Sequence, residues 1–501
     1  MKRPLERAID LHRKGKLSRA ERAYRSLLDE DPDDPAVLGS LGRLRLQRGD
    51  AGEAASFLVR AVRAAPTAAS HHELLAHAYR KLGNLDLAVG EYRLALRCGA
   101  PHSRCGNALG RLLLDRGEPF AALEVFLDSV KESPGVEATW LNLSIALNRI
   151  GDHGRAIEVC ERILAQDRGN RAALTNLGMA YRGLGRRAEA KEAFQRAGDF
   201  AQAQFNLGYL FLQVDDLARG FPLCERRREI SGVAPEVEAP EWTDGPAPGG
   251  TLAVIPEQGL GDTILMSRFF PELLGRFDRV VSRVPRPLSR LVGTISEDLE
   301  VVTDLAGLEV DVWCRSMSLP YLLGVDTIDR IPSADPFRLS ESRKEPGPLR
   351  IGLNWAGNPR FPYDAVRSTR LEELSLLLKA PGVEWVSLHK GHREREAEEH
   401  GLPQPLCHAH DFYDTALVIR NLDLVVSTET AIPNLSAALG VPTCVLTTLD
   451  PDWRWGSWYP SAEICRQDEP GNWYGAIARA LEAIRRMQEE TGRSDPAAEA
   501  A

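Results

Sequence analysis

Four loops carry the residues of this sequence best suited to chemistry, and each loop follows a short apolar run. The first loop, EQGLGDT, begins at Glu257 and contains Gln258 and two glycines. Gly259 and Gly261 allow a sharp turn and a close approach of the backbone to a ligand, and a helix is expected to begin at or beside Asp262. Because the third glycine of a dinucleotide-binding fingerprint is absent, the alternative is an ordinary strand–helix turn that Asp262 caps.

The second and third loops put cationic side chains beside expected strand ends. The second loop, NWAGNP, contains Asn358 and is followed by Arg367, an arrangement that suits an anionic ligand. The third loop, SLHKG, carries Lys390, which could act as a point charge for phosphate. In each case the alternative is a surface cation in contact with solvent.

The fourth loop, STETAIPN, leads directly into an apolar helical run, NLSAALG. A strand ends there and a helix N-terminus opens with free backbone N–H groups, which attract phosphate. The hydroxyls of Thr428 and Thr430 could cap this helix or bind a diphosphate, and the two roles are compatible.

Short apolar runs alternate with helical patterns on both sides of a charged, proline-containing break, SRKEPGP. The runs are TLAVIP, RVVSRV, LEVVTDL and EVDVWC before the break, and LRIGLNWA, VEWVSLHK, LDLVVST and PTCVLTT after it. Such alternation predicts parallel sheets with right-handed crossovers. We therefore expect two doubly wound halves that face each other across a cleft, with ligands at the carboxyl ends of the strands.

A 34-residue repeat occupies most of the chain before these runs. Glycine and alanine each recur at this step, at Gly15, Gly49, Gly83, Gly117, Gly151 and Gly185, and at Ala20, Ala54, Ala88, Ala122, Ala156 and Ala190. Each glycine supplies the positive φ of a tight turn between two helices, and each alanine lets their backbones approach. The period and pattern identify tetratricopeptide repeats, which must stack because one hairpin cannot bury its apolar face alone.

The expected role of the repeats is to bind a protein or peptide on their concave face. The alternative is that they only hold the second half of the chain or form a dimer.

Composition excludes several classes of protein. The formal net charge of −9 argues against a general nucleic-acid binder, which needs a basic surface. The N-terminus lacks an apolar signal-peptide core, and no run of about 18 apolar residues supports an integral membrane segment. The eight cysteines lack metal-ligand spacing, so we expect no metal site, and a cytoplasmic location.

Taken together, the loops of the second half resemble a known family. EQGLGDT, WAGNP with the following RS, SLHKG, the STET–NLSAALG helix and PDWRW look like the heptosyltransferase-type glycosyltransferases of family 9. The closest likeness is to the bacterial branch in which tetratricopeptide repeats precede that domain, and it runs from about Thr251 to Met487. The resemblance implies a multidomain protein, with an all-α tetratricopeptide superhelix followed by an α/β GT-B fold of two Rossmann-like subdomains.

The resemblance also implies an activity, which is inverting, metal-independent transfer of a sugar from a nucleotide-sugar donor, with no cofactor. By position, Asp262 matches the family's proposed catalytic base, and Gln258, Gly259 and Gly261 form the acceptor-side loop. The implied donor-binding residues are Asn358, Arg367, Lys390, Thr428, Glu429, Thr430, Ala431 and Asn434. The family commonly has Asp where this chain has Glu429, and His where it has Asn434.

Two further functions compete with sugar transfer to an acceptor, which could be a protein or a cell-envelope glycan. One is a non-catalytic interaction scaffold with a degenerate glycosyltransferase domain, which Glu429, Asn434 and Phe361 favour. The other is a nucleotide-sugar epimerase, which can share the GT-B fold but gives the repeats no evident purpose. Core packing is the expected role of the aromatic residues around PDWRW, and the alternative is that they line the donor pocket or brace its loop.

The domain organisation follows from these patterns. The repeat superhelix is expected over 1–229, with units starting near 1, 35, 69, 103, 137 and 171 and a capping hairpin over 201–229. A linker over 230–250 then leads to an acceptor-side subdomain over 251–345 and a donor-binding subdomain over 349–472. A helix over 473–488 is expected to cross back onto the first subdomain, and a disordered tail over 489–501 follows it.

Overall fold

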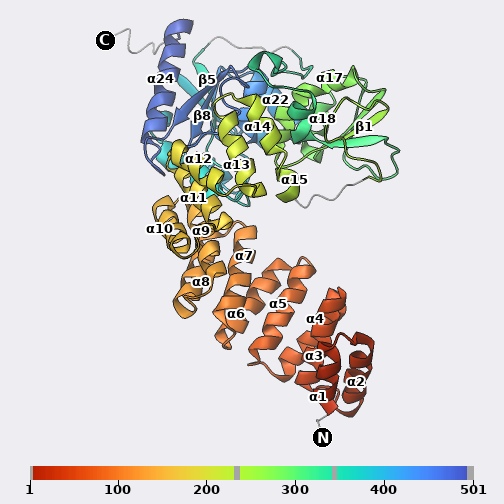
Figure 1. The fold of residues 1–501 in the computed structure, drawn as a ribbon. Coiled ribbons are helices and arrows are strands. Elements are labelled where there is room, and N and C mark those ends of the chain that lie inside the picture. Colours follow the sequence, from red (N-terminus) through yellow and green to blue (C-terminus); the bar gives the residue numbers. More distant parts are fainter. Residues whose placement is uncertain (1–3, 231–236, 341–346, 494–501) are drawn as a thin grey trace. The chain divides into compact units, whose positions relative to one another are not determined.

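The computed structural model describes residues 4–230, 237–340 and 347–493. The chain divides into two compact units, here called the first and second units. The first unit comprises Met1–Ile150 and Glu158–Ile163, and the second comprises Gly151–Ile157 and Leu164–Ala501. Figure 1 labels the elements in chain order.

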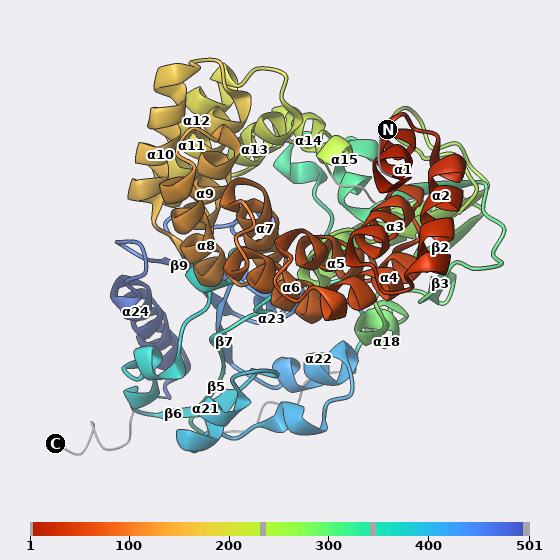
Figure 2. The same cartoon turned by 90° about the horizontal axis from the view of Figure 1, so that it is seen from below.

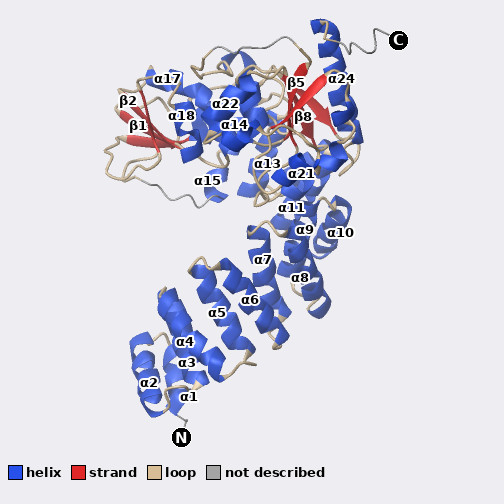
Figure 3. Cartoon of the chain, turned by 180° about the vertical axis from the view of Figure 1, so that it is seen from behind, coloured by secondary structure: helices blue, strands red, loops and turns tan. Residues whose placement is uncertain are grey.

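Helices alone build the repeat region, as the colouring in Figure 3 makes plain. Successive hairpins follow one another along the chain in Figure 2. The helices are α1 (Pro4–Arg13), α2 (Leu17–Glu30), α3 (Pro35–Arg48), α4 (Ala51–Ala64), α5 (Ala69–Lys81), α6 (Leu85–Arg97), the π-helical η1 (His102–Gly106), α7 (Asn107–Asp115), α8 (Pro119–Glu132), α9 (Glu137–Ile150), α10 (His153–Gln166), α11 (Arg171–Gly183), α12 (Arg187–Arg196), α13 (Ala201–Leu212), α14 (Leu217–Cys224) and α15 (Arg227–Ile230).

The physical roles predicted for the repeated residues are confirmed. All six repeated glycines have a positive φ, between 71° and 91°, and all six repeated alanines are fully buried. Small residues on the first helix of a hairpin are needed for close packing as well. A Cβ atom on Gly42 would lie 2.4 Å from Leu58, and one on Gly178 would lie 2.4 Å from Phe194. Leu58 and Phe194, each four residues after a repeated alanine, therefore fill the space that these glycines leave.

Two parallel sheets, with the helices that connect their strands, form the rest of the second unit. The first sheet has four strands in the order β3-β2-β1-β4, and the second has five in the order β6-β5-β7-β8-β9. The strands are β1 (Thr251–Ile255), β2 (Arg279–Arg283), β3 (Leu299–Val302), β4 (Val312–Arg315), β5 (Leu349–Asn354), β6 (Val383–Ser387), β7 (Leu424–Thr428), β8 (Thr443–Thr447) and β9 (Ala462–Arg466).

The eight predicted strands are all present, and every pairing between neighbouring strands is parallel. In the register of the first sheet, Leu252 of β1 lies opposite both Val280 and Val312. The prediction missed the edge strand β9, because AEICR is short, carries two charged residues and buries only Cys465. These findings establish a helical repeat region followed by an α/β region with parallel sheets.

Short helices connect the strands, and the longest helix of this region lies at its C-terminal end. The α-helices are α16 (Leu260–Met266), α17 (Phe270–Leu274), α18 (Ser289–Val292), α19 (Leu319–Leu322), α20 (Asp364–Arg367), α21 (Glu394–Glu399), α22 (Phe412–Arg420), α23 (Ala431–Ala438) and α24 (Tyr474–Thr491). The 3-10 turns are η2 (Ser267–Phe269), η3 (Arg286–Leu288), η4 (Ser316–Ser318), η5 (Ile328–Arg330), η6 (Leu371–Leu374), η7 (Leu377–Lys379) and η8 (Pro405–His408). Within the described residues, no helix has the length and hydropathy that a membrane crossing requires.

The prediction that the last helix crosses back onto the first subdomain is wrong. Helix α24 packs against β8, β9 and η7, all in the part of the chain that follows residue 349. Its apolar stripe, which includes Ile477 and Ile484, belongs to the core beneath the second sheet. The helix also continues to Thr491, so the first residues of the predicted tail are helical, while residues 494–501 lie outside the described part.

The segment 237–250, expected to be a linker, packs along the first sheet, whereas residues 231–236 lie outside the described part. Trp242 is buried in the same core as the two sheets, where its ring meets Phe277 edge-on. The Trp242 N–H donates to the carbonyl of Trp313 on β4 at 2.7 Å, and the Trp313 N–H donates to Pro240 at 3.1 Å. This segment therefore pairs with the edge of the first sheet.

Candidate functional site

Asp262 lies in the first turn of α16, just after β1. Its Oδ2 accepts a hydrogen bond from the Gly259 N–H at 2.8 Å, which caps the helix. Its Oδ1 pairs with Nη2 of Arg454 at 2.8 Å, and the two side chains are 13% and 10% exposed. The capping role that the sequence left open is therefore present, and both carboxylate oxygens have partners.

The N-terminal turns of α16 and α23 pack against each other. A Cβ atom on Gly261 would lie 2.8 Å from Nδ2 of Asn434 and 3.5 Å from Cα of Ala431. A glycine is therefore required at this position by contact with α23. Gly259 and Gln258 are exposed beside it, and Gln258 holds a φ of 61°, which is uncommon for a residue with a side chain.

Side chains at the start of α23 hydrogen-bond to backbone groups of its first turn. Thr430 Oγ1 accepts from the Ile432 N–H at 3.3 Å and from Nδ2 of Asn354 at 3.1 Å. Nδ2 of Asn434 donates to the Thr430 carbonyl at 2.7 Å. Thr428 is fully buried at the end of β7, and its hydroxyl oxygen has no hydrogen-bond partner within the part of the chain that the structure describes. Thr430 thus caps the helix, as the sequence allowed.

Arg454 joins the two helix starts, although the sequence reasoning did not single it out as a site residue. Besides Asp262, it contacts Asn434 Oδ1 at 3.2 Å and Asp452 Oδ1 at 2.9 Å. Burial opposes its charge, but the carboxylates of Asp452 and Asp262 outweigh this and raise the pKa of Arg454. Its position between two indoles, in the segment DWRW, was the signal that could have identified it.

Glu429 follows β7 and points its carboxylate toward the loop after β8. Its Oε1 accepts from Nε1 of Trp455 at 2.7 Å and from the Asp452 N–H at 2.8 Å. Burial, together with the charge of Asp452, raises the pKa of Glu429 to about 7. Glu429 is therefore partly protonated near neutral pH.

Of the three remaining donor-side predictions, one joins this group. Arg367 donates to the Glu429 carbonyl at 2.9 Å and stacks over the ring of Phe361 at 3.9 Å. Asn358 is exposed, and its Oδ1 accepts from the backbone of the turn that it occupies. Lys390 is exposed, and its ammonium donates to the carbonyl of Ala409, just after η8, at 2.6 Å.

His389, which precedes Lys390, is buried at the end of β6. Its Nδ1 lies 3.1 Å from Oδ1 of Asn354, and its ring packs against Trp355 at 4.8 Å. Burial lowers the pKa of His389 to about 4, so the imidazole is neutral at physiological pH. It braces Asn354, which in turn bonds to Thr430.

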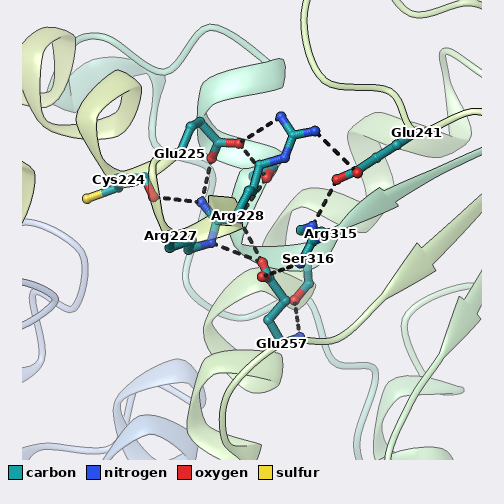
Figure 4. Close-up of polar contacts among 9 residues, drawn as sticks. Cys224, Glu225, Arg227, Arg228, Glu241, Glu257, Arg315 and Ser316 are labelled. Carbon is teal, nitrogen blue, oxygen red and sulfur yellow. Dashed lines mark hydrogen bonds and ion pairs between the residues drawn. The ribbon is translucent and has the colours of Figure 1, made fainter. Parts of the chain in front are cut away.

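A buried ion network fills the carboxyl end of the first sheet (Figure 4). Arg227 of α15 donates to Oε2 of Glu257 at 2.7 Å and to Oε1 of Glu225 at 2.6 Å. Arg315, the last residue of β4, lies 3.4 Å from Oε1 of Glu257 and 2.9 Å from Oε1 of Glu241. Three of these side chains, those of Arg227, Glu257 and Arg315, are each only 6% exposed at the residue level.

This network ties the end of the repeats to the loop that holds Asp262. Burial opposes the charge of Arg227, but Glu225 and Glu257 outweigh it and raise the pKa of Arg227. Glu257 directly precedes Gln258, so Arg227 anchors the start of that loop. The sequence reasoning did not foresee this network, because arginine and glutamate in loops usually face solvent.

The aromatic residues after β8 are mainly core residues, as expected. Trp458 and Tyr459 are almost completely buried. Phe221 of α14 meets the rings of Trp453 and Trp458 edge-on, at 5.9 and 5.8 Å. The last hairpin of the repeats therefore shares a core with the second sheet.

Comparison with known proteins supports the repeat region directly. Two family profiles, both described as tetratricopeptide repeat, match residues 11–78 with 149–209, and residues 107–171. Protein FlbA of Caulobacter vibrioides is 25% identical over 528 residues, which covers 95% of this chain and 83% of FlbA.

Two solved structures with a similar fold are also tetratricopeptide proteins. YrrB, described as having an unusual peptide-binding site, is 20% identical with a TM-score of 0.34, and the match covers 36% of this chain and 95% of YrrB. A protein from Parabacteroides merdae is 18% identical with a TM-score of 0.39, and the match covers 46% of this chain and 93% of that one. The N-terminal region of this chain is built of tetratricopeptide repeats.

Proposed function

We propose that this protein is a glycosyltransferase that moves a sugar from a nucleotide-sugar donor to an acceptor recruited by its repeats. The observation that carries the proposal is the meeting of two loops from different sheets. Asp262, after β1, and the start of α23, after β7, both contact Arg454 through hydrogen bonds of 2.8 and 3.2 Å. A carboxylate, a guanidinium and a helix N-terminus are the groups that such a reaction requires.

Each group has one role in the proposed reaction. Arg454 and the N-terminal turn of α23 attract the donor diphosphate, which draws the guanidinium away from Asp262. Asp262 then accepts the proton of the acceptor hydroxyl as its oxygen attacks the anomeric carbon. The bond from that carbon to the diphosphate oxygen breaks, and the leaving diphosphate carries away the electron pair. Inversion at the anomeric carbon follows from a single displacement.

Thermal-shift measurements with nucleoside diphosphates and nucleotide sugars test the first requirement. A donor that binds the folded chain at free concentration L stabilises it by RT ln(1 + L/Kd), so its melting temperature rises with the logarithm of the donor concentration above Kd. If no member of the panel shifts the melting temperature at millimolar concentration, the glycosyltransferase proposal is overturned.

The Asp262→Asn variant tests the chemistry once a donor is known. We expect turnover to fall about 100-fold or more, because the general base is lost, while donor binding changes little. Asp278→Asn, an exposed carboxylate in the turn before β2, is the matched control and should retain activity. Unchanged turnover in Asp262→Asn would remove this residue from the role of base.

One observation favours a second candidate, a protein-interaction scaffold without catalysis. Asp262, Thr430 and Asn434 are all satisfied by bonds within the chain, so the ligand-free arrangement is already complete. Glu429 and Asn434 also favour the scaffold, because the resembled family commonly has Asp and His at these positions. A scaffold predicts that a partner captured by the repeats binds Asp262→Asn and the unaltered protein equally, and that no nucleotide sugar is consumed.

A further inference from the structure

A cavity of about 370 Å³ lies beside the carboxyl ends of β8 and β9. Side chains from the repeats and from the second sheet line it together. The lining residues are Arg187, Gln213, Pro451, Asp452, Trp453, Trp455, Ile464, Arg466 and Arg479. Its size is that of a small-ligand site rather than of a groove for a folded partner.

Three of the lining side chains are arginines, from three separate elements. Arg187 begins α12, Arg466 ends β9, and Arg479 lies on α24. Arg479 donates to Oδ1 of Asp468 at 2.7 Å and to the Arg466 carbonyl at 2.8 Å. Among the described residues, no ion pair or hydrogen bond involves the guanidinium of Arg187 or that of Arg466.

The single carboxylate of the lining does not neutralise these cations. Asp452 is held by Arg454, with Oδ1 2.9 Å from the guanidinium Nε. Arg479 is paired with Asp468 and Asp452 with Arg454, so the guanidinium groups of Arg187 and Arg466 leave the lining with an excess of positive charge, which attracts an anion. Arginine offers a planar pair of N–H donors that matches phosphate oxygens.

The remaining wall is apolar and aromatic. Trp453 and Trp455 are 7% and 6% exposed, and Pro451 and Ile464 lie with them in the lining. Trp455 is fixed through its Nε1 bond of 2.7 Å to Glu429. Indole side chains beside guanidinium groups suit a ligand with a planar ring next to its phosphates.

We infer that this cavity binds a nucleoside phosphate, held by the three arginines at its phosphates and by the two indoles at its base. The repeats supply part of the site, because Arg187 belongs to α12 and Gln213 follows α13. Gln213 also donates to Asp450 and to the Pro451 carbonyl, both at 2.7 Å, and so fixes the loop that carries the indoles. The inference does not depend on sugar transfer, since it concerns residues outside the Asp262–Arg454 pair.

Titration of the full chain with ADP, UDP, GDP and inorganic pyrophosphate, followed by tryptophan fluorescence and calorimetry, tests the inference. At least one nucleoside diphosphate should bind more tightly than pyrophosphate. Arg187→Ala and Arg466→Ala should each weaken binding about tenfold, the loss expected when one charged hydrogen-bond donor is removed.

Arg186→Ala is the matched control for Arg187→Ala. Arg186 is adjacent and exposed, but it pairs with Glu189 and stacks on Tyr181, outside the cavity. Its loss should change nucleotide affinity less than twofold. Equal binding of pyrophosphate and nucleotides would overturn the role of the indoles. Nucleotide binding that is unaffected by both arginine variants, or absent altogether, would overturn the site itself.

Discussion

The carboxyl ends of the two sheets carry similar residue types but opposite arrangements. At the first sheet, Arg227 and Arg315 meet Glu257 in a buried network in which every charge has a partner. At the second sheet, Arg187 and Arg466 line a cavity, and Glu429 has a raised pKa beside a second carboxylate. Charged groups that satisfy one another hold parts of the chain together, whereas charges that border open space are available to a ligand.

The repeats contribute to both ends, but in different ways. Arg227 of α15 enters the first network as a structural partner. Arg182 of α11 pairs with Asp450 at 2.7 Å, which positions the loop beside the cavity. The last repeat hairpins therefore hold the first sheet through Arg227 and line the cavity beside the second sheet through Arg187 and Gln213.

The largest effect is expected from Arg227→Met. Removing this guanidinium leaves the carboxylates of Glu225 and Glu257 buried without their main partner, which should cost about 3–5 kcal/mol. Urea denaturation followed by tryptophan fluorescence measures this, since eight of the nine tryptophans lie in the second unit.

Arg226→Met is the control for this prediction. Arg226 is adjacent, but its pairs with Asp199 and Glu229 lie at the surface. We expect a much smaller change in denaturation midpoint. Equal changes in the two variants would mean that the network does not clamp the first sheet.

A smaller effect is expected from Arg454→Met, which separates the two loops that meet at Asp262. The variant loses two partly buried ion pairs, with Asp262 and Asp452, and one hydrogen bond to Asn434, for a cost of about 2 kcal/mol. The same denaturation assay applies, with Arg486→Met as control because its pair with Glu463 is exposed. If both variants behave alike, Arg454 does not link the two sheets.

The smallest effect concerns the pH dependence that Glu429 should create. Its pKa is about 7 in the folded chain against an ordinary value of 4.5, so the folded state binds the proton more tightly. Stability should therefore fall as pH rises from about 5 to 8, by on the order of 1–2 kcal/mol after allowance for partial exposure. Glu429→Gln, which keeps the acceptor oxygen, should be more stable than the unaltered chain at pH 8 and lack this decline. Parallel pH profiles for the two proteins would contradict the assignment.

The sequence predicted the repeats and strands well because their signals are local. A fixed 34-residue step and a positive φ at Gly49 or Gly83 depend only on one hairpin. The path of α24 was predicted wrongly because an amphipathic stripe does not say which sheet it covers.

The structure brings together only some of the candidate site residues. The structure brings Asp262, Thr430 and Asn434 near one another, as two loops at strand ends would suggest. It does not bring Asn358 or Lys390 into that group. Arg227 and Arg454 were missed because their partners are distant in the chain, so no local spacing could reveal the buried pairs.

The pairing of Pro240–Trp242 with β4 has a consequence for self-association. An uncovered edge strand offers its N–H and C=O groups to a strand from another copy, which promotes aggregation. Here the Trp313 N–H donates to the Pro240 carbonyl and the Trp313 carbonyl accepts from the Trp242 N–H, so these backbone groups of β4 already have partners. This border of the first sheet is therefore protected against growth by strand addition.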